Sequence, residues 1–111
     1  MNDRTLLELA ARAAGYKLSW SYDNHCCWIN EMRHDLDVTW NPLTDDGDAL
    51  RLAVKLGLIL ETDLDDASCS ATDVSYDNYT VEEHGDCPNA AVRLAIVSCA
   101  AEIGKSMGGG E

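Results

Sequence analysis

The stretch that decides the fold is residues 39–54, TWNPLTDDGDALRLAV. It contains a helix start, because Pro42 keeps the residue before it out of the helical conformation. Thr44, Asp45 and Asp46 can each accept a hydrogen bond from a first-turn N–H group. Carboxylates in that turn also meet the positive end of the helix dipole, so the stretch predicts a well-capped helix.

The helix predicted from this start runs over residues 44–56, because apolar side chains recur there every three to four positions. Gly57 is a natural end for it. The carboxylates of Asp45, Asp46 and Asp48 have two explanations. They cap the helix, or they form an acidic corner that binds a cation or a basic partner.

Length and charge narrow the class of protein. The 111 residues suit one domain, and the formal net charge is −12, from 20 acidic and 8 basic residues. Such acidity argues against direct binding to a nucleic acid backbone and favours a basic protein surface as partner. No apolar run is long enough to cross a bilayer, and the N-terminus lacks a signal peptide. We therefore expect a soluble protein of the cytoplasm that does not bind membranes.

The negative charge is concentrated in residues 61–86, which contain no lysine or arginine. This segment has two explanations: a solvated sheet edge whose carboxylates oppose aggregation, or a surface that imitates the charge of nucleic acid. The second leads us to predict a partner-binding surface of carboxylates with two aromatic anchors. Its residues are Asp63, Asp65, Asp66, Asp73, Asp77, Glu82, Glu83, Trp28 and Tyr76.

Periodicity elsewhere predicts an α+β fold: a mostly antiparallel sheet with helices packed on it, in the order α-β-β-α-β-β-β-α. The first helix ends at Gly15, and the last, apolar nearly all round, starts at Pro88 and ends at Gly104. Strands are expected at 17–22, 27–32, 58–62, 72–76 and 79–82, with loops at 33–38 and 63–70. A single domain over 1–104 is followed by a flexible tail, 105–111.

Aromatic side chains cluster in the first predicted hairpin, where Trp20 and Tyr22 share one face because strand side chains alternate. They either fill the core or form an exposed patch that binds a protein or stacks on a base.

Cysteine and histidine give only a weak indication of chemistry. The chain has five cysteines, an odd number that argues against a disulfide framework. Zinc would need ligands from His25, Cys26, Cys27, His34, His84 and Cys87. Adjacent strand cysteines point to opposite faces and cannot easily ligate one ion, so we predict no metal site. Local spacing without a cleft is not a site, so we also predict no cofactor and no catalytic residue. A hydrolase that uses Cys87 beside His84 is a minor alternative.

The motifs at either end of residues 40–104 resemble the phage αβα-sandwich family of small phage and prophage proteins. The first is Trp40-Asn41-Pro42-Leu43 followed by Asp45, Asp46 and Asp48-Ala49-Leu50. The second is His84-Gly85-Asp86 followed by Pro88, Ala90-Ala91, Arg93-Leu94-Ala95-Ile96-Val97 and Ala100-Ala101-Glu102-Ile103-Gly104. The resemblance implies a phage or prophage gene and a compact sandwich, and it implies no activity.

Together these features predict a phage-encoded accessory protein that binds and inhibits a host protein, namely a nucleic-acid-handling or defence enzyme. An alternative is sequestration of a nucleotide signal, which would require Arg33, Arg51 or Arg93 to face phosphate. The exposed edges expected of a small sheet also make a homodimer possible.

Overall fold

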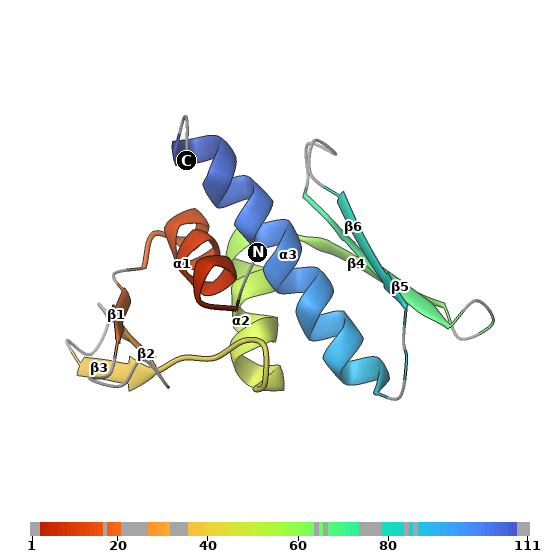
Figure 1. The fold of residues 1–111 in the computed structure, drawn as a ribbon, viewed down its shortest axis with the longest axis horizontal. Helices are drawn as coiled ribbons and strands as arrows, with labels where there is room; N and C mark the ends of the chain where they lie inside the picture. Colours follow the sequence, from red (N-terminus) through yellow and green to blue (C-terminus); the bar gives the residue numbers. More distant parts are fainter. Residues whose placement is uncertain are drawn as a thin grey trace.

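The computed structural model of the chain describes residues 3–16, 18–20, 27–31, 36–63, 65, 67–73, 79–83, 85 and 87–108. The elements in these residues are α1 (Asp3–Ala14), β1 (Leu18–Trp20), β2 (Cys27–Glu31), β3 (Leu36–Thr39), α2 (Asp46–Leu56), β4 (Ile59–Asp63), β5 (Ser68–Thr72), β6 (Tyr79–Glu83) and α3 (Pro88–Gly108). The strands form two antiparallel sheets, β1-β2-β3 and β4-β5-β6. Figure 1 shows the sheets at opposite ends of the molecule, with the helices between them. The predicted α+β class is confirmed.

Local signals place α2 where the sequence predicts it. Asp45 has extended backbone angles, and its side chain accepts a hydrogen bond from the Gly47 N–H group at 2.9 Å, so Asp45 is the N-cap. At the other end Gly57 adopts a left-handed φ of 67° and donates its N–H to the carbonyls of Ala53 and Val54. A residue with a side chain would be strained in that conformation, which explains why the helix ends at a glycine.

Helix α3 is the element that both parts of the core share. One side of it contributes Ile96, Val97 and Ala100 to a cluster with α1, α2 and Trp40. The other side contributes Ala91, Ala95 and Cys99 to a smaller cluster with Cys69 and Ala71 of β5. A helix that is buried on two sides must be apolar on both, as the composition of residues 88–103 predicts.

Gly104 does not end α3, contrary to the sequence prediction, and the helix continues to Gly108. The residue is buried, and a Cβ atom placed on it would lie 1.9 Å from the carbonyl oxygen of Leu9 in α1. Glycine is needed here because the two helix backbones nearly touch. Residues 105–108, predicted to be part of a flexible tail, are therefore helical. Residues 109–111 lie outside the described residues.

The strand predictions need two corrections. Residues 36–39 form β3, which pairs with β2, although part of this segment was predicted to be a loop. Strand β5 spans 68–72, so it begins within the predicted acidic loop and ends where the predicted strand begins. In both cases pairing with a neighbouring strand outweighs a polar composition that is typical of loops. Trp20 of β1 packs against the helical cluster, and Tyr22 lies outside the described residues.

Candidate partner-binding surface

The three carboxylates at the start of α2 are engaged within the protein. Asp48 is buried and accepts hydrogen bonds from the backbone N–H of Asn41 at 2.9 Å and from Arg51 at 2.6 Å. This bond to Asp48 raises the pKa of the Arg51 guanidinium. Asp46 forms an ion pair with Arg93. Capping and ion pairing account for this acidic corner.

Strand register separates the two faces of the sheet β4-β5-β6. The Thr80 hydroxyl donates a hydrogen bond to the carbonyl of Ala95 in α3 at 2.8 Å, so Thr80 lies on the face that α3 covers. Because strand side chains alternate, residues 79, 81 and 83 lie on the opposite face. We call that face of β4 and β6 the outer face. Its exposed residues are Ile59, Glu61, Asp63, Tyr79, Val81 and Glu83.

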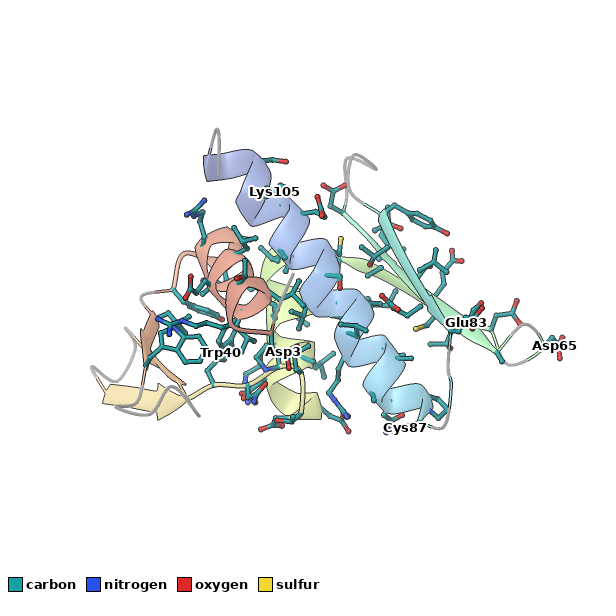
Figure 2. All side chains as sticks on the ribbon, in the orientation of Figure 1. Asp3, Trp40, Asp65, Glu83, Cys87 and Lys105 are labelled. Carbon is teal, nitrogen blue, oxygen red and sulfur yellow. The ribbon has the colours of Figure 1, made fainter. Side chains whose placement is uncertain are left out.

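Three of the predicted partner-binding carboxylates meet at one end of the outer face. Asp63 and Glu83 flank Ser68 in one cross-strand row. Asp65 follows in the turn, where its backbone N–H donates to the side chain of Asp63 at 2.9 Å. Figure 2 shows Glu83 and Asp65 at the same end of the sheet. We call Asp63, Asp65 and Glu83 the acidic end.

Two predicted carboxylates do not belong to this surface. Glu82 is half-buried on the face of β6 that α3 covers, where its backbone carbonyl accepts a hydrogen bond from the thiol of Cys69. Asp73 is only 8% exposed, and its backbone is hydrogen-bonded to the sulfur of Cys99. The charge of a residue does not show whether the fold exposes or buries its carboxylate. The sequence prediction therefore assigned too many carboxylates to the surface.

The remaining predicted residues divide by location. Trp28 lies in β2 of the other sheet, so its backbone is at the opposite end of the molecule from the acidic end (Figure 1). It cannot serve as the aromatic anchor beside those carboxylates. Asp66, Asp77 and Tyr76 lie outside the described residues, and so do Arg33, His25, Cys26, His34 and His84.

Exposed apolar side chains on the outer face and on α2 were missed. Tyr79 is 62% exposed and Val81 is 51% exposed, next to the carboxylates of the same face. On α2, Leu50 is 58% exposed and Val54, one turn later, is 72% exposed. Alternation in residues 79–83 signals that Tyr79 and Val81 share a face. The sequence does not show that α3 covers the opposite face of the sheet, so it does not show that Tyr79 and Val81 are exposed.

Two of the cysteines whose side chains the structure describes, Cys69 and Cys99, are buried. Burial raises the pKa of the Cys69 thiol, and the nearby Glu82 carboxylate adds to the effect. Burial, with the negative charges of Asp73 and Glu102, raises the pKa of the Cys99 thiol to about 11. Both thiols are therefore protonated near neutral pH and are poor nucleophiles and metal ligands. Cys87 is exposed at the start of α3, and among the described residues no three cysteine, histidine or acidic side chains could share a metal ion.

Comparison with other proteins adds no relative: no family model, curated protein or solved structure matches this chain. The resemblance to the phage αβα-sandwich family therefore stays a prediction. Among the described residues, no helix is both long and apolar enough to span a membrane.

Proposed function

We propose that this protein binds a basic protein surface through its acidic end. The observation that carries the proposal is the convergence of Asp63, Asp65 and Glu83, all exposed, at one end of a sheet. No lysine or arginine occurs between residues 61 and 86 to neutralise them locally. Carboxylates gathered in this way create a negative potential that attracts and orients a positively charged partner.

The partner we propose is a bacterial host protein whose own ligand is nucleic acid, because such proteins present basic surfaces. Occupying that surface with carboxylates would inhibit it. In this proposal the chain is a phage or prophage accessory protein that acts in counter-defence or on a nucleic-acid-handling enzyme. Tyr79 and Val81, exposed beside the carboxylates, would supply the apolar contact that long-range charge attraction alone lacks.

The test compares two variants that lose the same charge. One variant neutralises the acidic end with three substitutions, Asp63→Asn, Asp65→Asn and Glu83→Gln. The substitution at Asp63 keeps a side-chain oxygen that can accept the hydrogen bond from the backbone N–H of residue 65. The control variant neutralises three exposed carboxylates on α1 and α3, with Asp3→Asn, Glu8→Gln and Glu102→Gln. Each tagged protein is used for affinity capture from a bacterial lysate, and any captured protein is then purified for binding measurements.

We expect the unmodified protein to retain a basic protein at low salt and to release it at about 1 M salt, where the Debye length falls to about 3 Å. The acidic-end variant should bind it about tenfold more weakly, since each exposed ion pair contributes about 0.2–1 kcal/mol. The control variant should keep its affinity. Equal affinities for the two variants would rule out the acidic end as the binding surface.

A further inference from the structure

Strand β4 is an open edge of its sheet. In the part of the chain that the structure describes, it pairs only with β5, and all five of its residues are exposed. Alternate N–H and C=O groups of an edge strand point away from the sheet and can pair with another strand. These groups therefore make β4 a template for an incoming strand.

An apolar groove runs beside this edge. It has a volume of about 260 Å³ and lies between α2, β4 and α3, with apolar lining from Ala49, Leu50, Leu60, Val92 and Ile96. Leu60 remains 36% exposed, and the exposed side chains of Leu50 and Val54 extend the apolar surface along α2. Apolar side chains grouped beside an open strand edge favour a ligand that brings its own apolar residues.

The two faces of β4 differ in chemistry. Leu60 is paired with the buried Ala71, and both lie on the groove side of the sheet. Glu61 and Asp63 alternate with that side and lie on the outer face. A strand added to β4 would thus meet apolar surface on one face and carboxylates on the other.

From this geometry we infer that β4 receives an extended segment of the partner protein in which basic residues alternate with apolar ones. The backbone of the segment pairs with the open edge. Its apolar side chains enter the groove beside Leu60, and its basic side chains lie next to Glu61 and Asp63. This inference rests on the proposed function, since it specifies which part of a basic partner is bound, and how.

Charge decides against a second copy of the chain as the occupant. Two antiparallel β4 strands paired edge to edge would bring Glu61 and Asp63 of one copy close to the same residues of the other. Each chain also carries a net charge of −12, so the two copies repel each other. Like charges on paired strands are destabilising. A basic segment replaces that repulsion with attraction.

The test uses two labelled peptides of identical composition, each about ten residues long, which matches the upper range of strand lengths. One alternates lysine with valine, and the other carries its lysines in one block and its valines in a second. Fluorescence anisotropy measures the affinity of each for the full chain. We expect the alternating peptide to bind at least about tenfold more tightly, because only it can present both faces at once.

Charge reversal and groove variants locate the binding site. The double substitution Glu61→Lys and Asp63→Lys should lower the affinity for the alternating Lys–Val peptide about tenfold. It should raise the affinity for an alternating Glu–Val peptide. Leu50→Gln, at a position already exposed, should weaken the Lys–Val peptide several-fold by making the groove polar. The matched control, Asp3→Lys with Glu102→Lys, makes the same change in net charge on α1 and α3 and should leave the affinity unchanged.

Amide hydrogen exchange separates strand addition from simple charge adsorption. On binding, the β4 amides that point away from β5 should become protected from exchange. Equal binding of both peptides, or binding without this protection, would overturn the inference while leaving charge-driven capture of a folded basic protein intact. Protection of the same amides in a dimer of the chain alone would identify a second copy as the occupant and overturn it as well.

Discussion

The two sides of α3 differ in how they are packed. Toward α1 and α2 the helix joins a cluster with large side chains, among them Leu7, Leu52 and Trp40. Toward the sheet, the fully buried members of the cluster are alanines and cysteines, and larger side chains pack against it only partly buried. Large buried side chains contribute most of the apolar area removed from water, so we assign most of the stability to the helical side. The sheet side has small buried residues and an outer face with exposed apolar and acidic side chains, so it is the side suited to binding.

The largest expected effect is on the helical side. Trp40→Ala removes a nearly fully buried ring that packs edge-on against Tyr16, with ring centroids 5.7 Å apart. We expect the free energy of unfolding to fall by about 3–5 kcal/mol. Urea denaturation followed by circular dichroism measures it. A loss below about 1 kcal/mol would mean that this cluster is not the main source of stability.

The contact between α1 and α3 is the next largest. Gly104→Ala would place a methyl group against the backbone of Leu9, which no rotamer change relieves, so α1 has to shift. We expect a loss of about 1–3 kcal/mol, as for other overpacked sites. Lys105→Ala, one position later and exposed, is the matched control and should change stability by at most about 0.5 kcal/mol.

A smaller, pH-dependent effect is expected on the sheet side. The pKa of the Cys99 thiol is raised to about 11 in the folded protein. A raised pKa stabilises the fold fully below the unfolded pKa, and this stabilisation is lost as the pH rises towards the folded value. Between pH 9 and 10 the loss should be about 1 kcal/mol, given about 1.4 kcal/mol per pKa unit. Thermal melts of Cys99→Ala should show a weaker dependence on pH over that interval, and an identical dependence would contradict the assignment.

The smallest effects should come from the exposed apolar side chains. Val54→Ala and Val81→Ala remove methyl groups that are already largely in water, so stability should change by no more than about 0.5 kcal/mol. Thermal melts measure this directly. A loss of stability above about 1 kcal/mol for Val81→Ala would show that the outer face contributes to the stability of the fold. The two sides of α3 would then differ less in their contributions to stability.

The parts of the fold that local chemistry controls could be predicted from the sequence. Capping by Asp45 and the left-handed end at Gly57 depend on neighbouring residues only, and α2 was located to within two residues at its start. Strand β3 and the start of β5 depend on pairing with distant strands, and both were placed wrongly. Gly104 shows the same limit, because its role depends on Leu9 in another helix.

The candidate site divides in the same way. The sequence shows that residues 61–86 are acidic, and Asp63, Asp65 and Glu83 do gather at one end of the sheet. It could not show which carboxylates the fold covers, so Asp73 and Glu82 were assigned to the surface. The exposed apolar residues of α2 and β6 were missed, because their helical and strand patterns are also those of core residues.

The shared position of α3 has a consequence for synthesis of the chain. Both clusters are completed by residues that follow Pro88, after every other described helix and strand. During translation, α1, α2 and the strands leave the ribosome before the helix that buries them. A nascent chain that stalls before α3 would expose the apolar residues of both clusters together, making it a substrate for chaperones or proteases. Once α3 emerges, the two clusters should close in one cooperative step.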